Sequence, residues 1–285
     1  MSRIYKWCNG LSKQVRDSIT ISVTIVAITS AIMSIFGVSL GSYEKLSIWF
    51  RFCVVAFYFF IIYITAYIAI GKIFGNLINL TIRKTSVSVG CGDIFEAPGL
   101  RIIGCDTHFD TRVDDIIISK KSLHGQLFLK HGKKEEIDMA VNAEASRLKL
   151  HKNNDGMYDF PLGTIIRYDS SVDNHTYLML AMAELNPHHE THTNMAKFGL
   201  MLMKMWKEID RVYANHDVAL PLLGTGISRF DDGPKDKQNL LRCMLCTLNI
   251  SGVSLNSKVA ILIYGDTKDI PLYEYKDIFH TIPGR

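Results

Sequence analysis

A glycine-rich turn is the part of the sequence whose residue types most directly indicate binding chemistry. It lies within 220–230 and follows an apolar run, 218–223, that reads as a buried strand. Gly224 and Gly226 have no Cβ atoms, so the backbone can bring several N–H groups close to an anion. A purely structural turn is the alternative, because many αβ connections carry two such glycines. The residues expected to line an anion-binding loop are Leu223, Gly224, Thr225, Gly226, Ile227, Ser228 and Arg229.

A second turn with chemical potential, Gly92-Asp93-Ile94, follows the strand-like residues 86–89. The carboxylate of Asp93 can accept a hydrogen bond from an exocyclic amine of a ligand. It can also accept from backbone N–H groups and so begin a helical turn. The residues alone leave both roles open, and capping is the commoner one.

Ser122 and His124, with aspartates nearby, are the parts of a nucleophilic triad. Both lie on one short segment, however, and this spacing does not establish the geometry of a triad. A ligand-facing or helix-capping role for Ser119, Ser122 and His124 is therefore favoured over catalysis.

Two segments rich in histidine or cysteine do not fit known metal motifs. In 188–192 too few residues separate Glu190 from His192 for the two-turn zinc motif, and Cys243 and Cys246 have no second cysteine pair. We expect no metal and no cofactor. The cysteines also lack the spacing of a disulfide framework, which indicates a reduced, cytosolic domain.

The elements that hold these residues divide into a membrane part and a globular part. Residues 18–40 and 52–71 contain no charged side chain, and each run is long enough to cross a hydrocarbon core as a helix. A cleaved signal peptide and a buried hairpin of a soluble core are the alternatives. The predicted parts are a basic N-terminus at 1–17, a transmembrane hairpin at 18–76, a linker at 77–85 and one domain at 86–285.

The distribution of Lys and Arg predicts the orientation of the hairpin. Basic residues precede the first span, and Lys72, Arg83 and Lys84 follow the second. The positive-inside rule then places both chain ends in the cytoplasm, as a multi-pass protein of the inner membrane. Small and hydroxyl residues in the first span favour close helix packing and hence a homo-oligomer. The net charge of +4 is mild and its basic residues are scattered, so no nucleic-acid partner is expected.

Residues 86–285 alternate strand-like and helix-like segments, which predicts an α/β fold. The runs 116–118, 218–223 and 259–264 are continuously apolar, as expected for strands covered on both faces. A three-layer domain follows, and its ligands should bind where loops leave the carboxyl ends of the strands. The predicted strands are 86–89, 101–105, 115–119, 164–167, 177–183, 218–223 and 258–264, and the predicted helices are 134–150, 193–214 and 235–249.

Two turns taken together carry a family resemblance. Gly92-Asp93-Ile94 after the first strand and Pro221…Gly224-Thr225-Gly226-Ile227 after a late strand resemble the macro domain family. The resemblance covers about 86–285 and implies a three-layer macro domain with a mixed central sheet that binds ADP-ribose or a relative of it.

The resemblance extends to a subfamily through 109–111, 118–119 and 122–125, placed behind two spans. The chain is similar to the membrane-anchored macro-domain effectors of type II Thoeris anti-phage defence. This similarity implies a partner TIR-domain enzyme that converts NAD into an ADP-ribose conjugate, with histidine in this type. The effector would sense this small-molecule nucleotide signal, form a homo-oligomer and act on membrane lipid, damaging the bilayer.

Residue roles follow from the same resemblance. Asp93 is implied as the acceptor for the adenine amine, and the amides of 224–227 as the diphosphate cradle. Tyr264 could stack on adenine or ribose, with an ordinary core tyrosine as the alternative. Besides the glycine-rich loop, the residues expected to contact the ligand are Asp93, Ile94, Asp106, Phe109, Asp110, Thr111, Ser122, His124 and Tyr264.

One departure from the wider family bears on catalysis. Hydrolytic macro domains usually carry an Asn-Ala-Ala-Asn-like segment after the second strand, whereas this chain has Gly-Cys-Asp-Thr-His-Phe-Asp-Thr over 104–111. Binding without catalysis is therefore expected. The alternatives are a membrane-tethered ADP-ribosyl hydrolase and a membrane scaffold whose α/β domain binds a protein.

Overall fold

The structure is a computed structural model. The residues that it describes are 13–36, 47–115, 118–185, 191–226, 229–231, 233, 236–265, 267 and 270–275. By its internal contacts the chain divides into two compact units. One consists of Met1–Ile78 with Pro271–Thr281, and the other of Asn79–Ile270 with Ile282–Arg285.

The first unit contains two long helices, α2 (Lys13–Ile35) and α3 (Ile48–Phe74), which pack against each other. Ser18 and Ser22 are buried on α2, and their hydroxyls donate to backbone carbonyls one turn earlier, at 2.6 and 2.7 Å. Internal bonds of this kind satisfy hydroxyl groups where no water is available. The Gln14 side chain also donates to the Tyr67 carbonyl at 2.9 Å, which joins the two helices near the first turn of α2.

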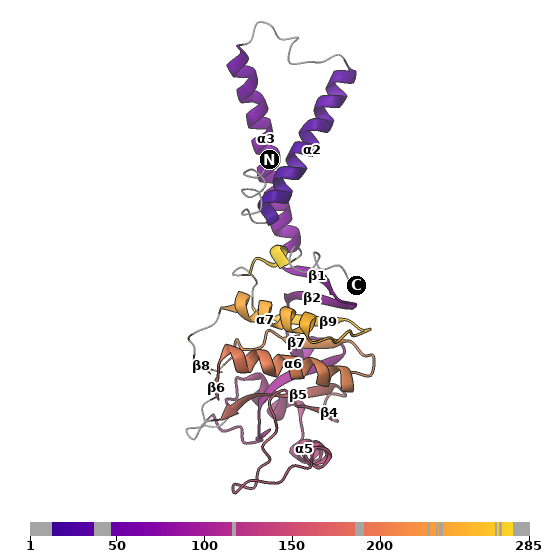
Figure 1. Ribbon diagram of the computed structural model, residues 1–285, viewed down its shortest axis with the longest axis vertical. Helices are drawn as coiled ribbons and strands as arrows, with labels where there is room; N and C mark the ends of the chain where they lie inside the picture. The colour runs from indigo at the N-terminus through magenta and orange to yellow at the C-terminus, as the bar shows by residue number, and fades with distance from the viewer. Residues whose placement is uncertain are drawn as a thin grey trace. The chain divides into compact units, whose positions relative to one another are not determined.

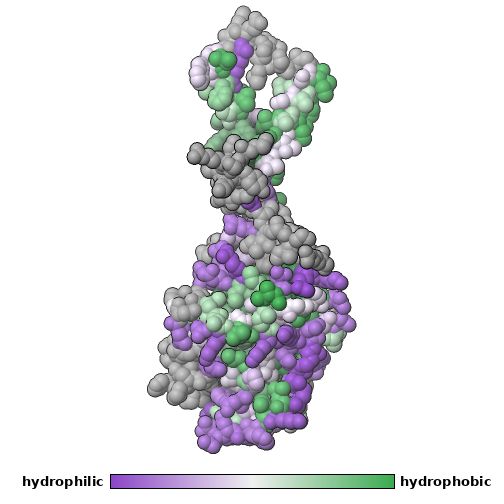
Figure 2. All heavy atoms as spheres, in the orientation of Figure 1, coloured by the Kyte–Doolittle hydropathy of each residue, from purple (hydrophilic) through white to green (hydrophobic). Residues whose placement is uncertain are grey.

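Both helices are long and apolar enough to cross a membrane, over Gln14–Ile35 and Ile48–Ile73. Figure 2 shows hydrophobic residues gathered along them. The helices begin earlier than the expected spans, at Lys13 and Ile48, and residues 37–40 of the first expected span lie outside the described residues.

Among the described residues, the second unit is built on a mixed sheet of nine strands. Figure 1 shows how the sheet and its helices are arranged. Neighbouring strands from β2 to β5 run parallel, and β4 pairs antiparallel with β5 beyond them. Strands that run parallel end at the same edge of the sheet, so their following loops lie side by side. The path is β1 (Leu77–Ile82), β2 (Thr85–Cys91), β9 (Val259–Ile263), β7 (Val218–Pro221), β3 (Leu100–Asp106), β5 (Thr176–Leu185), β6 (Thr191–Thr193) and β8 (Arg229–Phe230), with β4 (Ile165–Asp169) on β5.

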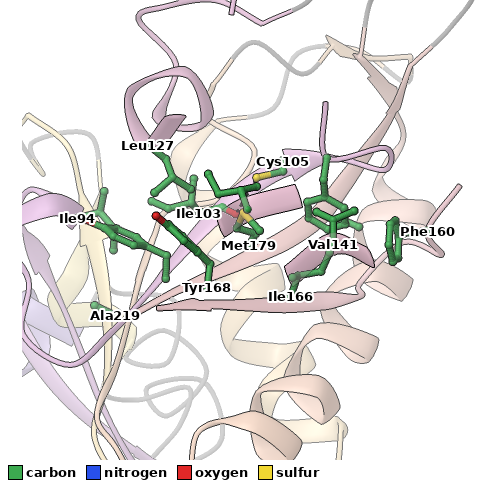
Figure 3. Packing of buried hydrophobic residues seen from close by; sticks show 14 of the residues in the cluster. Ile94, Ile103, Cys105, Leu127, Val141, Phe160, Ile166, Tyr168, Met179 and Ala219 are labelled. Atoms are coloured by element: carbon green, nitrogen blue, oxygen red, sulfur yellow. Dashed lines mark hydrogen bonds between the residues drawn. The ribbon is translucent and has the colours of Figure 1, made fainter. Parts of the chain in front are cut away.

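Helices cover both faces of this sheet, which confirms the predicted three-layer α/β fold. On one face α5 (Lys134–Leu148) packs against a core of β3, β4 and β5 side chains that includes Ile103, Ile166 and Met179 (Figure 3). On the other face α6 (Met195–Val212) and α7 (Lys237–Ile250) lie together (Figure 1). The fully buried Trp206 of α6 donates its ring N–H to the Thr247 hydroxyl of α7 at 3.1 Å.

Two sequence-based expectations are corrected by the structure. Residues 77–82, expected to lie in a linker, form β1, because alternate side chains at Ile78, Leu80 and Ile82 are buried as in an amphipathic strand. The strand expected at 115–119 is not found at its described residues. Asp115 has φ 64, outside the β region, and donates its N–H to the Ile118 carbonyl at 3.1 Å, while residues 116 and 117 lie outside the described part of the chain.

Candidate functional site

The carboxyl ends of neighbouring strands bring most of the expected site residues to one edge of the sheet. Along the order β2, β9, β7, β3, these ends are followed or marked by Asp93, Tyr264, the turn at 222–226 and Asp106. Neighbouring strands lie about 4.8 Å apart, so the three steps from β2 to β3 span about 14 Å. The site is therefore an elongated strip along the sheet edge.

The turn after β7 is closed on its protein side and open on its solvent side. Gly224 has φ 85, and a Cβ there would lie 3.0 Å from the Leu240 side chain of α7. The Thr225 hydroxyl donates to the Leu222 carbonyl at 2.8 Å and so braces the turn. A Cβ on the exposed Gly226 would meet nothing within 4 Å. Ile227 and Ser228, also expected in this loop, lie outside the described residues.

Phe230 and Phe198 pack behind this turn. Phe230 pairs with Thr193 between the short strands β8 and β6, and its ring lies edge-on to Phe198 of α6 at 5.7 Å. The ring of Phe230 also reaches 3.4 Å from the Cβ position of Gly224. Arg229 is placed in β8 by its backbone, and its side chain is not described.

Asp93 begins a short helical turn, η2 (Ile94–Glu96), at the end of β2. One carboxylate oxygen accepts the Phe95 N–H at 2.9 Å, which confirms the capping role. Because a carboxylate has two oxygens, the exposed second oxygen is left for an amine. The side chain of Ile94 is buried in the core, so only its backbone can reach a ligand.

The loop after β3 is organised by Asp106, which is only 5% exposed. Its carboxylate accepts the His108 N–H at 2.7 Å and the Asp110 N–H at 3.4 Å. Between these bonds Phe109 is held at φ 51, a backbone region that bulky residues rarely occupy. The Phe109 ring packs edge-on to Phe160 at 5.1 Å in the core, so it does not face the edge of the sheet as a ligand contact would.

Asp110 is buried and paired with an arginine that sequence reasoning missed. The Arg112 guanidinium donates to it at 2.6, 3.0 and 3.1 Å, and the Arg112 N–H donates at 2.9 Å. Burial alone would raise the pKa of Asp110, but these hydrogen bonds and the arginine charge lower it. The spacing of Asp110 two residues before Arg112 was the sequence signal that could have predicted this ion pair. Thr111, between the two residues, is half-buried.

Ser122 and His124 belong to the short helix α4 (Leu123–Gln126). The Ser122 oxygen accepts the Gly125 N–H at 3.0 Å and donates to the Ser119 carbonyl at 2.7 Å, which confirms the capping role for Ser122. Both hydrogen-bonding functions of this hydroxyl are thereby engaged. The described contacts do not join it to His124, so they form no triad.

His124 lies beside the Asp106 carboxylate, with Nδ1 3.7 Å from its oxygen. Its Nε2 is buried and has no hydrogen-bond partner among the described residues. Burial lowers the pKa of His124, although the carboxylates of Asp106 and Asp110 oppose this effect. A second histidine, His108, was not predicted from the sequence. Its Nε2 is hydrogen-bonded to the Asp159 carboxylate at 2.6 Å.

Tyr264 follows β9 and its side chain is 82% exposed, so the core-tyrosine alternative is wrong. Among the described residues there is no group of three His, Cys, Asp or Glu side chains that could hold a metal ion. Residues 186–190 of the histidine-rich segment lie outside the described part of the chain.

A mixed sheet with helices on both faces and a glycine turn after a central parallel strand is the arrangement of a macro-domain protein. Within that class, the chain belongs to the family described as "Thoeris protein ThsA, Macro domain", which matches residues 87–264. It is 31% identical over 219 residues to Thoeris protein ThsA of Bacillus amyloliquefaciens (strain Y2), and the match covers 73% of this chain and 72% of that protein.

Solved macrodomains from Oceanobacillus iheyensis are more distant. A structure of this macrodomain with ADP is 11% identical, with a TM-score of 0.48 over 72% of this chain and 98% of that one. A mutant of it with ADPR is 10% identical, with a TM-score of 0.49 and the same coverage.

Proposed function

We propose that this chain is a membrane effector gated by an ADP-ribose-type nucleotide that binds along the carboxyl edge of the sheet. The observation that carries the proposal is the order of groups along that edge. A carboxylate stands at β2, a glycine turn at β7 and a polar loop at β3. An extended ADP-ribose presents its amine, its diphosphate and its distal ribose in the same order.

Each position suits the chemistry of its part of the nucleotide. The free oxygen of Asp93 can accept from the adenine amine, and Tyr264, directly after the strand between β2 and β7, is exposed for stacking. The open face of the turn at Gly226 offers backbone N–H groups to a diphosphate. The bound nucleotide would thus lie across β2, β9, β7 and β3.

The distal end of the strip favours a ligand group that donates hydrogen bonds or carries positive charge. Asp106 and Asp110 are buried carboxylates there, in the segment 104–111 that lacks the Asn-Ala-Ala-Asn-like pattern of hydrolytic macro domains. The charge of Asp110 is balanced by Arg112, so the Asp106 carboxylate is the group that would attract an amino or imidazolium group and disfavour a third phosphate. This supports a histidine conjugate of ADP-ribose, supplied by a TIR-domain enzyme, as the signal.

The hairpin supplies the part of the protein that acts on lipid. Its two apolar helices span the membrane in our proposal, with both chain ends in the cytoplasm, and the liganded chains assemble and disrupt the bilayer. The ligand can drive this only by binding the assembled state more tightly than the resting state. Binding then shifts the population without any chemical step.

Calorimetry on the full chain in lipid nanodiscs tests the proposal. We expect saturable heat with the histidine conjugate, less with ADP-ribose, and none with either for Gly226→Glu. A Cβ at this position meets nothing within 4 Å, so we expect the glutamate to repel the anion without disturbing the fold. Gly199→Glu, at a helical glycine with equal free space, is the matched control and should bind as the wild type does. Absence of heat with both nucleotides in the wild type would overturn the proposal.

Binding without hydrolysis is part of the same proposal. It is supported by the engagement of the Ser122 hydroxyl in helix capping and by the burial of His124 Nε2 away from any described partner. Chromatography of the histidine conjugate after incubation with the protein should show no free ADP-ribose. Its appearance, abolished by Asp106→Asn, would favour the hydrolase instead.

A further inference from the structure

A short segment at the end of the described chain belongs to the hairpin rather than to the sheet. Pro271–Tyr275 contains the turn η4 (Leu272–Glu274) and is grouped with α2 and α3, which it contacts. Leu272 and Tyr275 are each 1% exposed, so the side chains of this segment are packed into the protein. We refer to Pro271–Tyr275 as the latch segment.

One hydrogen bond ties the latch segment to the start of the first apolar helix. The Tyr273 hydroxyl donates to the Asp17 carboxylate of α2. Asp17 stands next to the buried Ser18 and within the candidate span Gln14–Ile35. A carboxylate at the start of a span is stabilised by hydrogen-bond donors, and the Tyr273 hydroxyl is one of them. Burial and the neighbouring carboxylate raise the pKa of Tyr273 to about 12, so the hydroxyl keeps its proton at neutral pH.

The latch segment is also continuous with the strand that ends at the nucleotide strip. Residues 265–270 alone separate it from Tyr264, the exposed residue after β9. Within the described residues, the chain passes between the hairpin unit and the sheet unit at 78–79 and at 270–271. Both connections lead to β1 and β9, which are the two neighbours of β2 in the sheet.

We propose that Pro271–Tyr275 is a latch whose Tyr273–Asp17 bond holds the hairpin in its resting arrangement, and that a nucleotide contacting Tyr264 releases it. The release step rests on the proposed function, whereas the holding step does not. Ligand binding and the latch are then thermodynamically linked. The free energy by which the Tyr273–Asp17 bond stabilises the resting state opposes ligand binding and makes the apparent binding free energy less favourable by the same amount. Loss of the bond should activate the protein without ligand and sensitise it to ligand.

Dye leakage from phosphatidylethanolamine–phosphatidylglycerol vesicles that contain the full chain tests both steps. We expect Tyr273→Phe to leak without ligand about tenfold faster than the wild type and to need about tenfold less histidine conjugate, as loss of a hydrogen bond to a charged group predicts. Asp17→Asn should behave alike, and the double variant should add little, because both changes remove one interaction. Tyr67→Phe is the matched control, since it removes a hydroxyl of the same unit that bonds none of the described residues.

The outcomes separate the latch from the proposed function. Equal ligand-free leakage from Tyr273→Phe, Asp17→Asn and the wild type overturns the latch, whatever the ligand does. A wild type that binds no nucleotide in calorimetry defeats the proposed function, while ligand-free leakage still decides the holding step. If the Tyr273→Phe protein unfolds at a lower temperature than the wild type while Asp17→Asn does not, the leakage of the near-isosteric Asp17→Asn protein tests the latch.

Discussion

Leu240 lies 3.0 Å from the position that a Cβ of Gly224 would occupy, and Gly224 has φ 85. These two facts make glycine a requirement of the fold at this position, independent of any ligand. We predict that Gly224→Ala lowers the free energy of unfolding by about 1–3 kcal/mol, because the substitution meets both a strained backbone and a packed side chain. Chemical denaturation in detergent measures this.

The matched variant for that prediction is Gly226→Ala. Its Cβ would meet nothing within 4 Å, so its stability should equal that of the wild type. Equal stabilities of the Gly224→Ala and Gly226→Ala proteins would contradict the role given to Leu240.

Asp93 should contribute both to the stability of the fold and to the preference for adenine over other bases. Asp93→Ala removes the cap on Phe95 and should cost about 1 kcal/mol of stability. In competition calorimetry the wild type should prefer ADP-ribose to its inosine analogue, whose base carries an oxygen in place of the amine, by about tenfold. The Asp93→Ala protein should lose this preference, and a preference that survives would place the adenine elsewhere.

The Arg112–Asp110 pair should stabilise the fold in a pH-dependent way. The folded pKa of Asp110 is lowered, so its contribution is present above the unfolded value of 3.8 and is lost as pH falls through the folded value. Arg112→Gln should therefore be less stable than the wild type at pH 7 by about 1 kcal/mol, since the arginine is half-exposed. The difference should shrink in unfolding curves recorded below about pH 4. A difference independent of pH would mean that packing, not charge, is lost.

His124 should make the protein less stable in mild acid. Its folded pKa lies below the usual 6.5, so the unfolded chain takes up a proton first as pH falls. Stability should then decline from about pH 6.5 toward the folded pKa, by at most about 1.4 kcal/mol per pH unit. His124→Gln should reduce the dependence of the unfolding free energy on pH between pH 7.5 and 5.5. An unchanged dependence would mean that other histidines cause it.

Tyr264 should contribute to binding and nothing to stability. Its exposed ring makes Tyr264→Ala neutral in thermal unfolding, while loss of stacking should weaken nucleotide binding about tenfold. Tyr264→Phe keeps the ring and should bind as the wild type does. Equal affinities of the Ala and Phe variants would remove Tyr264 from the site.

Local patterns predicted the central sheet and the glycine turn well. The apolar runs behind β7 and β9 and the small residues at Gly224 and Gly226 are local signals, and the structure places them as expected. The expected strand at 115–119 rested on the same kind of local signal, and it is not found at the described residues, where Asp115 has φ 64. Strand propensity depends on the pairing that the rest of the fold permits.

Contacts between distant residues had no local signal. Tyr273 and Asp17 are 256 positions apart, and neither residue stands in a motif. The pairing of Leu240 with Gly224 likewise follows only once α7 is packed on the sheet. Residue types in the sequence pointed to the candidate ligand-binding residues, but not to the residues that hold them in place.

The position of β1 determines where this protein can be cut. β1 pairs with β2 and is the last strand on its side of the described sheet. A soluble fragment that begins at residue 86 would expose the unpaired N–H and C=O groups of β2, beside Val87 and Val89, and would be prone to join edge to edge with other copies. A fragment that begins at Leu77 keeps this strand, so the backbone groups of β2 stay paired on that side.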